Sequence, residues 1–232
     1  MYGYYPLLDP TYLILIPALI VSAWAQFKVS STFNKYQGVR SANGYTGAQV
    51  ARMLLDGAGL YNVPIEITNG KLSDHYDPTR KVLRLSGDVY QGTSVASIGV
   101  AAHEVGHAIQ HKEGYKALVF RNSIVPVVNF ASSFSWILFI LGIFLGYSGL
   151  TTLGIILFSV VVVFQLITLP VEFNASSRAL QLIQARGILY ENEISGAKKV
   201  LDSAALTYVA ATLMAVAQLL RLIAVSNRNS RD

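Results

Sequence analysis

The chain has no cysteine, few histidines and little charge. Of its 232 residues, four are histidine and only 13% are charged, while 53% are hydrophobic. Without cysteine there is no disulfide framework and no thiolate metal site, so a metal ion would need histidine, aspartate or glutamate ligands. The charged fraction is about half that of an ordinary soluble domain, which indicates long apolar segments.

Uncharged stretches predict membrane-spanning helices, each of which needs roughly 20 mostly apolar residues. The central stretch, 122–171, is long enough for two spans joined by the turn sequence GYSG, and shorter uncharged stretches lie near both ends. The sequence therefore predicts four spans, at residues 10–28, 124–146, 150–170 and 203–225. The last segment is rich in alanine, so a buried core helix remains an alternative for it.

The positions of lysine and arginine predict how the chain is oriented. Residues 28–121 carry 11 of the 18 lysines and arginines, and residues 171–202 carry four. The positive-inside rule places both segments in the cytoplasm and the N-terminus outside. The tail with Arg228 and Arg231 would then lie outside, against the rule. The net charge of +5 suits a protein seated on anionic lipid, and no basic–aromatic pattern indicates a nucleic-acid partner.

Three of the four histidines lie in one short segment, AAHEVGHAIQH. On a helix His103 and His107 project from the same face, one turn apart. This is the H-E-x-x-H pattern, in which two histidines bind zinc and the intervening glutamate, here Glu104, acts as general base. The surrounding residues, from about Thr93 to His111, are predicted to form a helix whose apolar stripe faces away from the two histidines.

A catalytic zinc site usually has a third protein ligand, and the best candidate is Glu172 in the segment LPVEFNASSRAL. Pro170 is placed to begin a helix and Gly187 to end one. Small residues around Glu172 would allow close approach to another helix, and the predicted two-span hairpin returns the chain to the side of the first motif. From the residues alone, a second interpretation stays open, in which Glu172 only satisfies the N-terminus of its own helix.

These two motifs together resemble the YugP-like family of membrane neutral zinc metallopeptidases and, more distantly, membrane proteases of the HtpX and CAAX-prenyl type. The resemblance covers nearly the whole chain. It implies that His103, His107 and Glu172 hold one Zn²⁺ per chain and that Glu104 is the base. It also implies a mainly α, multi-pass membrane protein with a cytoplasmic zincin-like (gluzincin) α+β catalytic region.

One departure from the distant relatives concerns the residue four positions after the ligand glutamate. The relatives carry an acid there, whereas this chain has Ser176, with Asn174 between. A carboxylate that orients a ligand histidine is therefore absent or supplied elsewhere. Ser176 and Asn174 are the candidates for side chains that lie next to the metal ligands.

The segment before the H-E-x-x-H motif predicts a small α+β region. TGAQVARMLLDGAGL reads as an amphipathic helix, and VPIEITN and KVLRLSGDVY read as two strands of a small β-hairpin around a turn-rich loop. The edge of such a hairpin could hold an extended peptide by strand addition. In the loop, His75 could donate to an oxyanion, or Asp74 or Asp77 could orient a ligand; a solvated loop histidine is the alternative.

The expected organisation has five parts: an N-terminal transmembrane helix, a cytoplasmic catalytic region, a two-span hairpin, cytoplasmic helices with the third ligand, and a C-terminal transmembrane or core helix with its tail. Their predicted boundaries are 1–29, 30–121, 122–171, 172–202 and 203–232.

The expected function is a zinc-dependent endopeptidase at the cytoplasmic membrane surface, acting on membrane-associated proteins or peptides. Three alternatives stay open: a catalytically silent zinc-binding membrane scaffold, a zinc hydrolase for a non-peptide bond, and an intramembrane protease of the site-2 type. The retention of Glu104 argues against the scaffold, because a degenerate site can lose its base before its ligands. The polar flanks of the motif helix argue against a site inside the bilayer.

Overall fold

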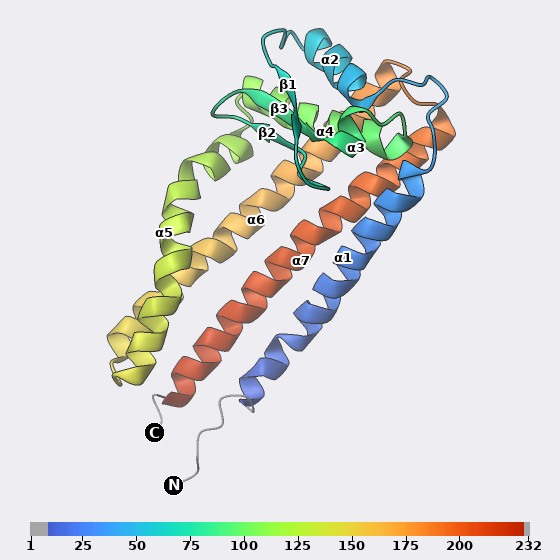
Figure 1. Cartoon of the computed structure of the whole chain (residues 1–232). Helices are drawn as coiled ribbons and strands as arrows, with labels where there is room; N and C mark the ends of the chain where they lie inside the picture. Colours follow the sequence, from blue (N-terminus) through green and yellow to red (C-terminus); the bar gives the residue numbers. More distant parts are fainter. Residues whose placement is uncertain (1–8, 230–232) are drawn as a thin grey trace. The chain divides into compact units, whose positions relative to one another are not determined.

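The computed structural model describes residues 9–229, which are mainly helical and include one small three-stranded sheet (Figure 1). The expectations for the N-terminus itself and for Arg231 lie outside the described residues. The chain divides into two compact units, and each of the four long helices contributes residues to both. The described parts of the helical unit are residues 9–25, 120–169 and 207–229, and the mixed unit comprises residues 26–119 and 170–206.

The helical unit is held together by apolar contacts between long helices. A short 3₁₀-helix, η2, precedes the first of these helices. The elements are η2 (Pro10–Ile14), α1 (Ile16–Gln37), α5 (Lys116–Phe144), α6 (Ser148–Ala185) and α7 (Glu191–Asn229). Gly154 of α6 lets that helix approach α5, because a Cβ there would lie 2.7 Å from the carbonyl oxygen of Ser135. Side chains such as Leu13, Ile20 and Phe144 are exposed, as lipid-facing residues would be.

Three of the helices, α5, α6 and α7, are long and apolar enough to cross a membrane. The predicted spans 150–170 and 203–225 lie within α6 and α7, and the predicted span 124–146 extends two residues beyond the end of α5 at Phe144. The first predicted span, 10–28, is not among the candidates found in the described residues. Residues 10–14 form η2, and α1 already meets Lys28 after a short uncharged stretch.

Ionic and aromatic contacts link the residue before η2 to the end of α7. The carboxylate of Asp9 caps η2 and also lies 3.1 Å from Nη1 of Arg228. The guanidinium of Arg221 lies over the ring of Tyr12, 3.9 Å from its centroid. Arg228, which conflicts with the positive-inside rule, is therefore paired with an acid within the protein.

The mixed unit contains the sheet, with β3 (Val82–Ser86) between its two edge strands. β1 (Ile65–Thr68) runs parallel to β3, with Ile65 opposite Leu83, and β2 (His75–Asp77) runs antiparallel to it. The predicted β-hairpin of β1 and β3 is therefore wrong. The intervening segment provides the crossover that parallel strands require and contributes β2, whose His-Tyr-Asp sequence lacks β-branched residues. The predicted strand over 81–90 ends early because Gly87–Tyr90 form a short helix, α3.

Helices pack around the sheet to form the core that positions the site. The predicted amphipathic helix is present as α2 (Gly47–Gly57), and Thr46 and Gln49 form a capping box at its start. Buried residues of α2, including Leu54 and Leu55, join the same core as α4 (Val95–Lys112). The predicted helix start at Pro170 is wrong, because α6 begins at Ser148 and continues through this proline.

Candidate metal centre

The helix α4 presents the two histidines of the motif on one face. Ser94 caps this helix, its Oγ accepting a hydrogen bond of 3.0 Å from the backbone N–H of Ser97. Further along, the rings of His103 and His107 have centroids 4.8 Å apart and planes at 88°. Residues of the predicted apolar stripe are fully buried and anchor the helix in the core: Val95, Ile98, Ala102 and Val105.

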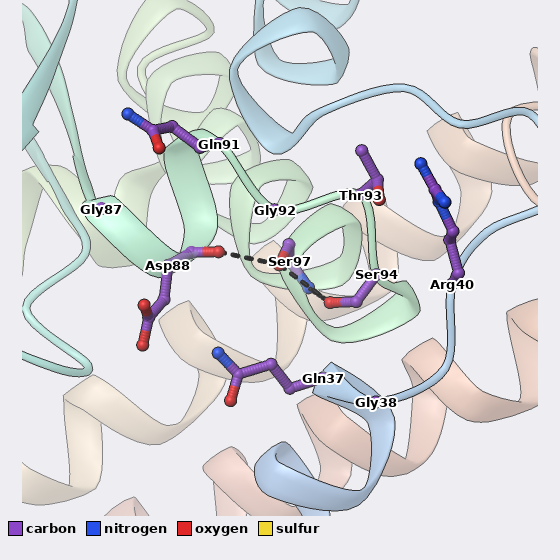
Figure 2. Close-up of a pocket in the computed structure, with 10 residues that line it drawn as sticks. All are labelled: Gln37, Gly38, Arg40, Gly87, Asp88, Gln91, Gly92, Thr93, Ser94 and Ser97. Atoms are coloured by element: carbon purple, nitrogen blue, oxygen red, sulfur yellow. Dashed lines mark hydrogen bonds between the residues drawn. The ribbon is translucent and has the colours of Figure 1, made fainter.

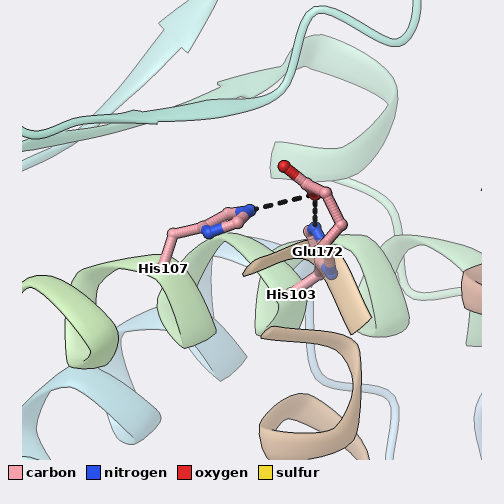
Figure 3. Close-up of side chains that lie close together, drawn as sticks. All are labelled: His103, His107 and Glu172. Atoms are coloured by element: carbon pink, nitrogen blue, oxygen red, sulfur yellow. Dashed lines mark ion pairs between the residues drawn. The ribbon is translucent and has the colours of Figure 1, made fainter. Parts of the chain in front are cut away.

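The helix α6 brings Glu172 to these histidines. Its Oε2 lies 3.3 Å from Nε2 of His103 and 3.4 Å from Nε2 of His107 (Figure 3). The residue is only 3% exposed. Glu172 lies well inside α6, so the interpretation in which it merely satisfies the N-terminus of a helix does not hold.

The three side chains fit a single zinc ion. Ligand atoms at zinc distances of about 2.0–2.1 Å in tetrahedral geometry are separated by about 3.3 Å, close to the two distances from Glu172. One ligand atom from each of His103, His107 and Glu172 can be chosen so that all lie within 4.8 Å of one another. Two imidazoles and one carboxylate form a donor set that suits zinc and leaves a fourth position for water or substrate.

A glycine explains how the two helices come so close. Gly106 lies on α4 between the ligand positions and the backbone of α6. A Cβ at Gly106 would lie 2.7 Å from the carbonyl oxygen of Ala175 and 3.2 Å from its Cα. Because the obstructing atoms are backbone, a larger residue would force the helices apart. The small residues around Glu172 thus serve the close approach that the sequence predicted.

Each histidine has a neutral hydrogen-bond partner on its other ring nitrogen. Nδ1 of His103 lies 3.1 Å from Oγ of Ser176, and Nδ1 of His107 lies 3.0 Å from Oε1 of Gln110. When Nε2 of each ring binds a metal ion, Nδ1 carries the proton and can donate it to Oγ of Ser176 or to Oε1 of Gln110. The structure therefore supplies a hydroxyl and an amide where a carboxylate often orients a zinc-binding histidine.

Gln110 is a residue that the sequence arguments did not assign to the site. It is fully buried, and its Nε2 donates to the carbonyl oxygen of Val171 and to Oδ1 of Asn174, both at 2.9 Å. Arg178 also donates to Oδ1 of Asn174, at 2.8 Å. The predicted residue Asn174 thus reaches His107 through Gln110. The available signal was the position of Gln110, three residues after His107 on the same helix.

The candidate base, Glu104, is turned toward the sheet. It is 8% exposed, and its Oε2 accepts a 3.0 Å hydrogen bond from the backbone N–H of Tyr76 in β2. The hydroxyl of Tyr76 lies 3.0 Å from Nδ1 of His111, near the end of α4. His111 therefore takes part in this contact and lies outside the cluster of His103, His107 and Glu172.

Charge and burial oppose each other at His107. Burial lowers the pKa of His107, but the hydrogen bond to Glu172 and the negative charges of Glu104 and Glu172 outweigh it, so the pKa is raised. The carboxylates thus stabilise positive charge on the α4 face. The same negative charges would stabilise a bound divalent cation.

Comparisons with known proteins agree with this geometry. The family described as "Putative neutral zinc metallopeptidase" matches residues 11–227. The chain belongs to this family. A relative described as "Putative membrane protease YugP", from Bacillus subtilis (strain 168), is 57% identical over 219 residues, covering 94% of this chain and 97% of the relative. No solved structure shows significant similarity to the chain.

In this member of the metallopeptidase family, His75 lies apart from the His–Glu cluster. It is exposed, with Nδ1 2.8 Å from the carbonyl oxygen of Ser73 and Nε2 3.4 Å from Nη1 of Arg84. The carboxylate of Asp77 pairs with Arg84, and that of Asp74 accepts from Ser86. These bonds do not bring His75, Asp74 or Asp77 to a ligand histidine.

A separate polar cavity of about 430 Å³ lies at the start of α4 (Figure 2). Its buried hydroxyls are satisfied by the protein, because Oγ of Ser97 donates to the carbonyl oxygen of Asp88 and lies 2.8 Å from Oγ of Ser94. These bonds fix the first turn of α4 and, with it, the direction of the helix that carries the histidines.

Proposed function

We propose that this protein is a zinc-dependent endopeptidase that hydrolyses peptide bonds in membrane-associated proteins or peptides. The observation that carries the proposal is the pair of near-equal distances from Glu172 to His103 and His107, with Glu104 adjacent on the same helix. Membership of a family described as a neutral zinc metallopeptidase supports the same chemistry.

The roles of the side chains follow from their positions. A zinc ion at the three ligands would supply a Lewis acid that polarises the scissile carbonyl and acidifies a water molecule. Glu104 would take the proton of that water and pass it to the leaving amine. Ser176 and Gln110 would hold the two imidazole rings in the orientation that presents Nε2.

The edge of the sheet offers a place for the substrate backbone. β2 is an edge strand, and its Tyr76 N–H already points to Glu104. An extended peptide could add along this edge and place its scissile bond beside the base. Strand addition would give affinity through main-chain hydrogen bonds with little dependence on side-chain sequence, which suits a protease with broad substrates.

The membrane arrangement is proposed from charge and length. We infer four spans, with α1 as the shortest, a gluzincin-like catalytic region in the mixed unit, and both charged segments in the cytoplasm. The active site would then face the cytoplasm at the bilayer surface. Support comes from three apolar helices and from the 11 lysines and arginines within residues 28–121.

Two of the alternatives make different structural demands. An intramembrane protease needs its motif helix in the bilayer, but α4 is not among the apolar spans found in the described residues and is packed into the core of the mixed unit. A silent scaffold needs the ligands but not Glu104, whose buried carboxylate is retained beside them. A hydrolase for non-peptide bonds would share the chemistry and differ only in substrate.

Zinc content and proteolysis, measured together on the purified full chain in detergent, test the proposal. Wild type should bind one zinc ion per chain and cleave denatured casein. Glu104→Gln should keep zinc and lose cleavage, and Glu172→Ala should lose both. Glu191→Gln, an exposed change at the start of α7, is the matched control and should behave like wild type.

Other outcomes would change the assignment in specific ways. Full zinc and full activity in Glu172→Ala would remove Glu172 from the ligand set. Zinc binding by wild type without cleavage of casein or of membrane-protein substrates would favour the scaffold. Cleavage that survives Glu104→Gln would exclude Glu104 as the base.

A further inference from the structure

A basic pocket lies between α1 and α7, within the mixed unit. The pocket has a volume of about 420 Å³. Its lining comes from one face of each helix, because residues spaced three, four and seven apart share a face. The lining residues are Lys28, Thr32, Lys35 and Tyr36 of α1, and Lys199, Asp202, Ser203 and Leu206 of α7.

The charge of this pocket is positive and not neutralised by the protein. Lys28, Lys35 and Lys199 are exposed and make no ion pair within the described residues. The single acid, Asp202, is already paired, its Oδ2 lying 2.6 Å from Nζ of Lys198. The lining therefore carries three lysines, and its one carboxylate is already paired with Lys198, which is not a lining residue.

The pocket also contains a buried hydroxyl that is free to bind a ligand. Thr32 is 8% exposed, and its hydroxyl has no hydrogen-bond partner within the described residues. The hydroxyl of Ser203, in contrast, donates to the carbonyl oxygen of Val200. A phosphate oxygen accepts from both hydroxyl and ammonium groups, so Thr32 and the lysines form a suitable donor set for a phosphate.

The position of the pocket along both helices points to the source of that phosphate. On α1 the uncharged run ends immediately before Lys28, and on α7 the uncharged run begins at Ser203, directly after Asp202. The lining thus lies where each helix changes from apolar to charged, the level at which lipid headgroups meet a membrane helix. Leu206 continues the lining on the apolar side.

We propose that this pocket binds the phosphate-bearing headgroup of an anionic phospholipid. The lysines contact the phosphate, Thr32 donates to one of its oxygens, and an acyl chain leaves past Leu206 toward the apolar segment. The proposal does not rest on the peptidase function, because none of the lining residues belongs to the zinc cluster. It differs from simple snorkelling of lysines, which needs neither a pocket nor Thr32.

The test compares lipids and free phosphate on the full chain in a zwitterionic detergent. Binding of dioctanoyl phosphatidylglycerol, dioctanoyl phosphatidylcholine and inorganic phosphate is followed by native mass spectrometry and by thermal shift. The triple variant Lys28→Gln, Lys35→Gln, Lys199→Gln is compared with Lys71→Gln, Arg80→Gln, Lys81→Gln, which removes the same charge from a loop outside the pocket. Thr32→Val removes the hydroxyl while keeping the shape of the side chain.

Phosphatidylglycerol should bind wild type and the loop variant alike, and the pocket variant should bind it at least about ten-fold more weakly. Thr32→Val should weaken binding with no change in charge, which keeps the proposal testable if the triple variant does not fold. Equal loss in the pocket and loop variants would overturn the site. Inorganic phosphate binding as tightly as phosphatidylglycerol would overturn the lipid assignment in favour of a soluble phosphate.

Discussion

The side-chain oxygen of Gln110 lies 3.0 Å from Nδ1 of His107, and the amide nitrogen of the same side chain binds α6 through Val171 and Asn174. One buried amide therefore orients a candidate ligand on α4 and ties it to the helix that carries Glu172. Orientation of a ligand ring and separation of the two helices are coupled through this residue.

Replacing Gln110 should weaken zinc binding. Gln110→Leu removes the acceptor for His107 and both donors to α6, and loss of such a partner typically costs 10- to 100-fold in metal affinity. Gln110→Glu keeps an acceptor for Nδ1 and should retain more of the affinity. Competition with a chromogenic chelator measures both, with Gln181→Leu, at an exposed position of α6, as control. Wild-type affinity in Gln110→Leu would show that the ring is held by other contacts.

Two glycines of α4 should respond oppositely to the same substitution. Gly106→Ala places a Cβ 2.7 Å from the backbone oxygen of Ala175, so the helices must separate and both zinc content and stability should fall. A Cβ at Gly99 would meet atoms of Ala197 at 3.5 Å and beyond, which are ordinary contacts. There the gain in helix propensity, up to about 1 kcal/mol, should dominate. Zinc content and the thermal midpoint distinguish them, and equal effects would contradict the close approach at Gly106.

Acid should stabilise the fold through Asp74. Burial raises the pKa of the Asp74 carboxyl, although hydrogen bonds from Ser86 act in the opposite direction. The folded state thus holds this proton more tightly than the unfolded state, and the free energy of unfolding falls as pH rises from about 4 through the raised pKa. Asp74→Asn removes this contribution.

The measurement is the difference in thermal midpoint between wild type and Asp74→Asn across pH 3.5 to 7. As pH increases through that window, the thermal midpoint of Asp74→Asn should rise relative to that of wild type. The midpoint of Glu191→Gln should show no such trend relative to wild type. A constant difference across the range would mean that the pKa of Asp74 is the same in the folded and unfolded states.

The absence of cysteine makes topology directly testable. Single changes to cysteine at the exposed positions Asn69, Ser148 and Asn229 introduce the only thiols in the chain. A membrane-impermeant maleimide added to intact cells should label Ser148→Cys and Asn229→Cys, and Asn69→Cys only after permeabilisation. Labelling of Ser148 and Asn229 from opposite sides would contradict the proposed number of spans after α5.

Much of the candidate site could be predicted from the sequence, because it depends on the spacing of residues within one helix. The four-residue spacing of His103 and His107 determines their common face once α4 forms, and the buried stripe of α4 matches the predicted one. Glu172 was reached through the small residues around it and through the return of the chain after a two-span hairpin. Its competing interpretation depended on a helix start at Pro170.

That start was wrong because a proline inside a long helix resembles, in local sequence, a proline that opens one. α6 tolerates Pro170 within a continuous helix that extends from the apolar segment to the site. The parallel pairing of β1 with β3 was missed for a related reason. The direction of β1 relative to β3 depends on the crossover made by the segment between them, which local alternation of residues does not report.

The role of Gln110 and the pocket between α1 and α7 could not be predicted from sequence, because both depend on contacts between residues far apart in the chain. The fully buried amide of Gln110 donates to a carbonyl oxygen of α6, which is far away in sequence. The residues near Gln110 do not indicate that partner. In the same way, Lys28 and Lys199 become neighbours only when the first and last helices pack together.

The separation of the ligands along the chain also has a consequence for biosynthesis. His103 and His107 leave the ribosome before α5 and the first part of α6, and Glu172 follows within α6. A nascent chain therefore offers two ligands to zinc long before the third is made. A complete ligand set can therefore form only after the chain has been synthesised as far as Glu172 and that part of α6 has packed against α4.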